Sequence, residues 1–164
     1  MKYRYLVVAT LLGALCAFGV ASAIGKQGDK KKKPYKAFYA LATGKKEVSP
    51  TTGKKGAGDP DGRAGFTAVF DGNQFCWSFA AKNVDGTPSG AHIHRGQPNE
   101  NGPIVIPLDT PASTDPGAAS GCTTVELDLA KAIRKNPRKY YFNLHSTPDF
   151  PAGAVRGQLF GKRG

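Results

Sequence analysis

Hydrophobic and polar residues alternate along two neighbouring stretches in the first half of the chain. Every second position is apolar in residues 66–70 and again in residues 75–79, and most of these apolar side chains are aromatic. Because successive side chains of a strand point to opposite faces, this spacing predicts two β-strands, each with one apolar face. Asp71-Gly72 between them is typical of a tight hairpin turn. We therefore expect an antiparallel pair whose aromatic rings lie on the core side.

Short apolar runs of the same kind recur through the chain, separated by turn residues. Only residues 129–135 have helical spacing, and Asn136-Pro137 is expected to end that helix. The polar stretch 43–63 is rich in glycine, proline, lysine and aspartate, which predicts a long loop. Many short strands, with 21 glycines and 12 prolines as turn residues, indicate an all-β fold: an antiparallel β-sandwich or flattened Greek-key barrel with one short helix. The further strands are expected at 38–42, 91–94, 104–107, 123–129, 140–146 and 154–160.

The first 23 residues have the three parts of a secretory signal peptide. A lysine and an arginine supply a positive start, residues 6–20 form an apolar run, and residues 21–23 offer a small-residue cleavage site. Residues 1–23 are therefore predicted to be removed, which places a mature chain starting at Ile24 in a secreted or periplasmic, extracytoplasmic location. An uncleaved membrane anchor is the alternative, although the run is shorter than the roughly 20 residues of a typical span. No transmembrane helix is predicted in the mature protein.

Cysteine usage agrees with export. Of the three cysteines, Cys16 lies in the predicted signal peptide, so the mature chain keeps Cys76 and Cys122. Thiols oxidise in extracytoplasmic compartments, and free cysteines are uncommon in exported domains. We therefore predict a disulfide between Cys76 and Cys122, with two separate buried thiols as the alternative.

Positive charge is concentrated near the start of the predicted mature chain. Residues 24–55 carry ten lysines against two acidic residues, a net charge of +8, whereas residues 56–164 carry eleven basic and ten acidic residues. Residues 24–37 lack apolar periodicity and predict a basic, disordered linker. Such an arm is either a solvated linker or a contact for an anionic surface, such as lipid or an envelope polymer. A specific nucleic-acid partner is not predicted, because aromatic residues are not interleaved with a basic groove.

All three histidines lie in two short motifs. His92 and His94 are two positions apart in a predicted strand, so both imidazoles are expected on one face. His145 has the same strand parity as Asn143. If the two strands are neighbours, the imidazoles form a compact site with Asn143, and with Arg156 on a further strand. Neutral imidazoles are ligands for copper or zinc, and three of them with an open fourth position form a recurrent metal site.

The same residues have a second interpretation. In that alternative, the histidines, Asn143 and Arg156 form a buried polar network that braces loops, with Glu47 or Asp149 and backbone carbonyls as acceptors. A copper or zinc site and a purely structural cluster are therefore both open at this level, with the three histidines as the candidate ligands.

Several motifs occur together in an order that resembles a known family. They are LATGKKEVSP at 41–50, AHIHRG at 91–96, NGPIV at 101–105, NLH at 143–145 and FPAGAVRGQL at 150–159. Together they resemble the CHRD domain, a module named from chordin and common in exported bacterial proteins, and the resemblance assigns residues 38–162 to that domain. It implies an all-β extracellular module. The chain differs from the family pattern mainly in a surface loop.

A fainter local likeness is to copper-zinc superoxide dismutases. In those enzymes a His-x-His strand supplies copper ligands, and a later arginine guides the anion to the metal. His92 and His94 resemble the first element, and Arg156 resembles the second. No histidine is left to serve as the bridging ligand, so the likeness covers only a short spacing.

Familiar catalytic motifs are missing from the sequence. It contains no Gly-x-Ser-x-Gly elbow, no phosphate-binding P-loop, no dinucleotide fingerprint and no Cys-x-x-Cys pair, so we assign no catalytic residue. We expect an exported, non-catalytic CHRD-domain module that binds an unidentified protein or envelope polymer, or that has a structural role. The alternative is a copper- or zinc-binding protein with a superoxide-dismutase-like histidine site.

Overall fold

The computed structural model describes residues 35–113, 115 and 117–163. The predicted signal peptide at 1–23 and the predicted basic linker up to residue 34 lie outside the described residues. The first strand starts at Tyr35, so the last three residues assigned to the linker are part of a strand.

Nine strands, one α-helix and two short 3-10 helices make up the described chain. Among these described elements, no helix is long and apolar enough to cross a bilayer. The helix α1 spans Leu127–Lys135, and the 3-10 helices η1 and η2 span Gly44–Lys46 and Pro137–Lys139. The strands are β1 (Tyr35–Thr43), β2 (Arg63–Asp71), β3 (Gln74–Lys82), β4 (Thr87–Arg95), β5 (Ile104–Leu108), β6 (Gly117–Thr124), β7 (Tyr140–Thr147), β8 (Phe150–Gln158) and β9 (Phe160–Arg163).

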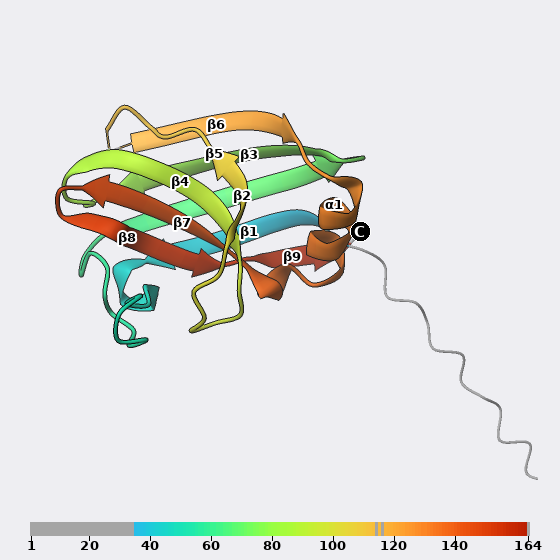
Figure 1. Ribbon diagram of the computed structural model, residues 1–164. Helices are drawn as coiled ribbons and strands as arrows, with labels where there is room; N and C mark the ends of the chain where they lie inside the picture. The colour runs from blue at the N-terminus through green and yellow to red at the C-terminus, as the bar shows by residue number, and fades with distance from the viewer. Residues whose placement is uncertain (1–34, 114, 116, 164) are drawn as a thin grey trace, which may run out of the picture. The chain divides into compact units, whose positions relative to one another are not determined.

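All of these strands pair antiparallel in one sheet. The order is β5-β4-β7-β8-β1-β2-β3-β6, and β9 pairs with the first half of β1. The sheet curls so that β4, β7 and β8 lie across from β1, β2 and β3, forming a nearly closed, flattened barrel (Figure 1). β3 and β4 follow each other in the chain but lie apart in the sheet, so the chain crosses between the layers there. These features confirm the predicted all-β fold class with a single helix.

Aromatic side chains fill the space between the two layers. The predicted hairpin is present, with Asp71 opposite Gln74 and with Gly72 in the left-handed conformation that its turn requires. The Phe142 ring of β7 stacks on Phe66 at 4.8 Å and lies 4.9 Å from Phe79, centroid to centroid. The core face of β7 is thereby packed against β2 and β3, which leaves the opposite face of β7 to carry polar residues.

The prediction of a strand at 123–129 is wrong beyond residue 124. β6 ends at Thr124, and the helix begins at Leu127. Apolar residues alternate at 125–129, but the buried side chains of the helix are Ala130 and Ile133, which are three residues apart as on one helix face. β6 itself consists of glycine, alanine, serine, threonine and one cysteine, so hydrophobic alternation could not reveal its true start.

The expected single strand at 154–160 is divided in two. β8 begins earlier, at Phe150, and β9 starts only at Phe160. Between them Leu159 is fully buried, and its N–H donates to the carbonyl of Tyr140. The chain therefore changes partner at this residue, from β7 to the first half of β1.

Cys76 and Cys122 form the predicted disulfide. They stand directly opposite each other on β3 and β6, with 4.0 Å between their Cα atoms. Cys76 lies on the strand face opposite the buried Trp77, as its parity predicts. The bridge ties β6, an edge strand with few apolar side chains, to the rest of the sheet.

Replacing both cysteines in Cys76→Ser/Cys122→Ser is expected to lower the free energy of unfolding by about 2–4 kcal/mol. The bridge closes a loop with a sequence separation of 46, and opening it gives the unfolded chain more conformational freedom. Urea unfolding of the variant and the wild type measures the difference, and wild type in reducing buffer serves as the matched control. A double variant as stable as the oxidised protein would show that β6 is held without the bridge.

Candidate metal centre

The pairing of β4 with β7 brings the three histidines to one face of the sheet. His92 stands opposite Asn143, and His145 stands opposite Gly90. Residues directly opposite each other in an antiparallel pair share a face, so His92, His94 and His145 project together. We call these three residues the histidine cluster. The residues between them, such as Ile93, point into the core.

The imidazoles of the histidine cluster are close enough to act on one ion. The ring centroids are 5.6 Å apart for His92 and His94, 5.2 Å for His92 and His145, and 6.4 Å for His94 and His145. One nitrogen from each ring lies within 4.8 Å of those from the other two. The structure thus brings together the three residues that the sequence proposes as ligands.

Backbone carbonyls orient two of the rings. His94 Nδ1 lies 2.9 Å from the Gly102 oxygen, and His145 Nδ1 lies 3.0 Å from the Pro151 oxygen. A carbonyl oxygen can only accept a hydrogen bond, so both Nδ1 atoms must carry the proton and donate. In a neutral imidazole the other nitrogen then has a free lone pair, which is the form that binds a metal.

Three ring nitrogens of the histidine cluster are buried without a hydrogen-bond partner. They are Nδ1 of His92 and Nε2 of His94 and His145. Buried polar atoms normally have a partner, and leaving one without costs about 1–3 kcal/mol. The unpartnered nitrogens of His94 and His145 are the ones that the carbonyl contacts leave unprotonated.

The surroundings keep His92 and His94 neutral. Burial, together with the neighbouring imidazoles of His145 and His94, lowers the pKa of His92 to about 4. Burial also lowers the pKa of His94, although its bond to Gly102 acts in the opposite direction. A buried imidazolium is disfavoured because it loses its hydration. At neutral pH these two rings therefore hold lone pairs rather than positive charge.

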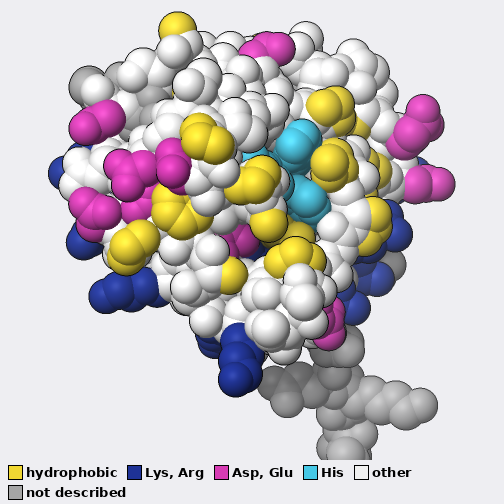
Figure 2. Space-filling model, turned by 60° about the vertical axis from the view of Figure 1, so that its left-hand side comes forward, with side chains coloured by type: hydrophobic (Ala, Val, Ile, Leu, Met, Phe, Trp, Pro, Cys, Tyr) yellow, Lys and Arg dark blue, Asp and Glu magenta, His cyan; other side chains and the backbone are white. Residues whose placement is uncertain are grey.

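The histidine cluster reaches the surface of the molecule. Figure 2 shows histidine side chains exposed on one face and framed by hydrophobic side chains. His94 is the most enclosed, with 8% of its surface exposed, while His92 and His145 are half-buried. The His92 ring packs over Gly90, where a Cβ atom would lie only 2.8 Å from Cε1 of the ring, so the close approach requires glycine.

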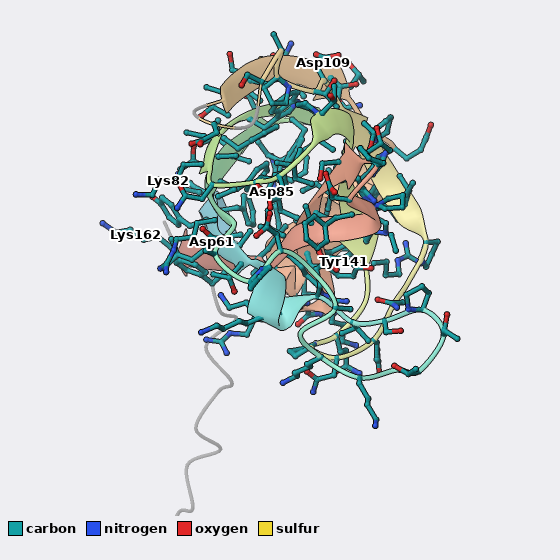
Figure 3. All side chains as sticks on the ribbon, turned by 90° about the vertical axis from the view of Figure 1, so that its left-hand side faces the viewer. Asp61, Lys82, Asp85, Asp109, Tyr141 and Lys162 are labelled. Carbon is teal, nitrogen blue, oxygen red and sulfur yellow. A yellow bond between two sulfur atoms is a disulfide. The ribbon has the colours of Figure 1, made fainter. Side chains whose placement is uncertain are left out.

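A stack of three side chains extends from the histidine cluster along the sheet. The Tyr141 ring, labelled in Figure 3, is nearly parallel to that of His94, with centroids 4.7 Å apart. The guanidinium carbon of Arg156 lies 3.5 Å from the centroid of the Tyr141 ring. Arg156 stands opposite Asn143, so the predicted strand neighbourhood is present, and its charge lowers the pKa of His94. The cation contacts Tyr141 by a cation–π interaction.

Arg156 holds the loop at residues 96–103. Its guanidinium donates to Oδ1 of Asn101 and to the backbone oxygens of Gln97 and Glu100, at 2.7–3.1 Å. This loop also supplies the Gly102 carbonyl that orients His94. Arg156 therefore acts through the loop to position a histidine, a role that its resemblance to an anion-guiding arginine does not suggest.

Asn143 is held by a buried carboxyl group. Its Nδ2 donates to Oε1 of Glu47 and, at 2.9 Å, to the carbonyl of Val155. Glu47, rather than Asp149, is thus the acceptor for Asn143 in the polar network. Burial raises the pKa of Glu47 to about 7, while the positive charge of Arg156 and the bond from Asn143 lower it. The carboxyl group packs over Gly153, where a Cβ atom would lie 2.8 Å from it.

Several contributors could not be recognised in the sequence. The carbonyls of Gly102 and Pro151 come from loop and hairpin backbone, and every residue carries such a group. Tyr141 looks like an ordinary core aromatic, and it is indeed buried, but it stacks on a candidate ligand. The two-residue period already predicts that Tyr141 shares a face of its strand with Asn143 and His145, but it does not reveal the stacking on His94.

Comparison with known proteins gives one match. The family model described as the CHRD domain matches residues 38–159. No curated protein and no solved structure matches the chain significantly.

Glu47→Gln is expected to gain stability relative to wild type as pH rises. The pKa of Glu47 is about 7 in the folded protein and near its usual 4.5 in the unfolded chain, so ionisation opposes folding. The cost is absent below pH 4.5, grows between 4.5 and 7, and is fully present above 7. Glutamine never ionises and can still accept the bond from Asn143. The expected gain at pH 8 is on the order of 3 kcal/mol.

Urea unfolding of both proteins at pH 4.5, 6 and 8 measures this effect, because the difference between them cancels the titration of the histidines. A difference in unfolding free energy that stays constant or shrinks with rising pH would contradict the raised pKa.

Proposed function

The chain belongs to the CHRD-domain family, and within that family we propose that it is an exported, non-catalytic module that binds one copper or zinc ion. One observation carries the proposal: His92, His94 and His145 offer three buried, unpartnered ring nitrogens in one cluster. A site of this kind gives those nitrogens the partner that they lack.

The ring nitrogens of the histidine cluster would have to move slightly closer together to bind one metal ion. Bond lengths of about 2.0–2.1 Å allow two nitrogen ligands of one zinc ion to be at most about 4.2 Å apart. One nitrogen from each ring lies within 4.8 Å of those from the other two, so binding one ion would draw the rings slightly closer together. A set of imidazoles without thiolate or carboxylate favours copper or zinc.

A structural polar network is the second candidate, and specific hydrogen bonds support it for part of the site. Asn143 and Glu47 bond each other, and Arg156 braces the loop at 96–103. This alternative does not explain the unpartnered nitrogens of the histidine cluster, since a network selected for order alone normally satisfies its buried atoms. We therefore propose that Asn143, Glu47 and Arg156 support the site and that the histidines bind the ion.

The proposal concerns binding rather than turnover. The likeness to copper-zinc superoxide dismutases rests on the spacing of His92 and His94, with Arg156 as the counterpart of an anion-guiding residue. The guanidinium of Arg156 is engaged by Asn101 and by two backbone carbonyls of the loop at 96–103. Because these bonds already occupy the guanidinium, Arg156 is not free to guide an anionic substrate, and we propose no redox turnover.

The purified mature protein, without an affinity tag, is expected to bind one Cu²⁺ or Zn²⁺ ion per chain. Removing a ligand in His94→Ala should weaken binding by at least about 100-fold, because loss of a direct ligand exceeds the 10–100-fold effect of a supporting residue. Ser89→Ala, at an exposed position of the same strand, is the matched control and should bind like wild type. Isothermal titration calorimetry and elemental analysis measure both quantities.

The pH dependence of this binding follows from the same rings. Protons compete with the ion for the ring nitrogens. Because the pKa of His92 is lowered to about 4 and that of His94 is also lowered, retention should persist below the usual imidazole range near 6.5 and fail toward pH 4. A wild-type protein that binds neither ion, or a His94→Ala variant that binds as tightly as wild type, would leave the structural network as the better account.

Export is the remaining part of the proposal. It is supported by the charged start, the apolar run and the small-residue site at 21–23, and by a disulfide of the kind that oxidising compartments favour. Five lysines within residues 24–34 would provide a contact with anionic lipid or envelope polymer. The intact mass of protein recovered from the extracytoplasmic fraction should match that of a chain beginning at Ile24. A mass that retains residues 1–23 would favour the uncleaved anchor instead.

A further inference from the structure

A pocket of about 360 Å³ lies on the outer side of β1, away from the histidine cluster. Its walls come from β1, from η1 and the loop after it, from Pro98 and Asn99 of the loop at 96–103, and from β8 and the start of β9. None of the three histidines lines it, and Arg156 reaches it from the far end of the stack on Tyr141. This volume is within the usual range of small-ligand sites, about 300–1,000 Å³.

Apolar surface forms one side of the pocket. Leu41 and Phe160 line it and are 66% and 42% exposed, although both are large and hydrophobic. Tyr39, 37% exposed, stacks on the Phe160 ring with centroids 5.6 Å apart and extends this surface. Single exposed apolar residues are common, but a cluster beside a concave site is typical of a binding surface.

Positive charge forms the other side. Lys46, Lys55 and Arg156 line the pocket, and no acidic residue does. Lys46 Nζ donates to the backbone oxygen of Leu41, which holds the ammonium group over the apolar surface instead of leaving it free in solvent. A concave site with one sign of charge and a low-dielectric wall concentrates the potential and attracts anions.

We propose that this pocket, the β1–β9 pocket, binds an acidic carbohydrate. A sugar carboxylate meets Lys46 and Lys55, and the C–H face of the sugar ring packs on Phe160. The amide of Gln158 and the guanidinium of Arg156 are already bonded to backbone oxygens, so they form a fixed polar wall that needs no rearrangement. The combination of cations with an aromatic face in a compact pocket suits a ring that is anionic at its edge and apolar on its face.

The proposal is independent of metal binding and goes beyond it. If the module is exported to the envelope, polymers rich in uronic acid are the natural source of such a ligand. The two sites share Arg156 and the loop at 96–103, but no proposed metal ligand lines the pocket, so replacing His94 removes none of the pocket's side chains.

The probe is a hexamer of galacturonic acid, with cellohexaose as its uncharged counterpart, titrated into the mature protein by calorimetry at moderate salt. The galacturonate hexamer should bind and cellohexaose should not. The variant Lys46→Glu/Lys55→Glu should weaken binding at least about tenfold, because it replaces two charge-assisted contacts by repulsion. The matched control Lys45→Glu/Lys54→Glu makes the same change of net charge at adjacent exposed lysines that do not line the pocket, and it should change binding by less than about twofold.

A second pair of variants separates the apolar contact from general electrostatics. Phe160→Ser should weaken binding about tenfold, whereas Ile104→Ser, an exposed apolar residue on β5, should leave it unchanged. Thermal unfolding of each variant confirms that it is folded. Equal weakening by both lysine pairs, equal effects of the two serine variants, or failure of the wild type to bind the galacturonate hexamer would each overturn the proposal. Unchanged hexamer binding by His94→Ala keeps this result distinct from the metal-binding test.

Discussion

A backbone carbonyl accepts hydrogen bonds and never donates them, and the histidine cluster depends on this restriction. The Gly102 and Pro151 oxygens contact Nδ1 of His94 and His145, so the protons of these rings are held away from the cluster. The free lone pairs then belong to Nε2 of each ring, both of which are buried without a partner. The neighbouring loop and strands keep these two carbonyls in place.

Each carbonyl is held by a different part of the sheet. The loop at 96–103 carries Gly102 and is bonded to Arg156, whose guanidinium stacks on Tyr141 behind His94. Pro151 lies in β8, next to the turn that joins it to β7. The aromatic core beneath, with Phe142 packed against β2, keeps β7 flat against the opposite layer. Unpartnered buried nitrogens cost stability, about 1–3 kcal/mol each, and coordination of an ion would offset that cost.

Strand parity was sufficient to predict which side chains share a face, but not which strands are neighbours. The two-residue period places His92 on the same strand face as His94, and His145 on the same face as Asn143. These assignments hold in any fold in which both segments are strands. That β7 lies between β4 and β8, with His92 opposite Asn143, is decided by pairing across the whole sheet. The family resemblance supplied the expectation that these strands belong to one domain, and the match over residues 38–159 confirms the family.

The wrongly predicted strand bounds and the unrecognised histidine partners have local physical causes. The stretch at 123–129 alternates like a strand but is followed at once by residues with helical spacing, and burial of Ala130 and Ile133 decides in favour of the helix. β6 lacks β-branched and aromatic residues, apart from its threonines, so its position follows from pairing with β3 and from the bridge to Cys76 rather than from propensity. The carbonyl partners of the histidines are backbone groups and leave no trace in residue identity.

The tautomers of His94 and His145 test the central claim most directly. Long-range ¹H–¹⁵N correlation spectra of the metal-free, ¹⁵N-labelled protein at neutral pH report which ring nitrogen carries the proton. The structure predicts protonated Nδ1 and unprotonated Nε2 in both rings. Protonated Nε2 atoms with bare Nδ1 atoms would contradict the account, because the carbonyls would then orient neither ring and the lone pairs would point away from the cluster.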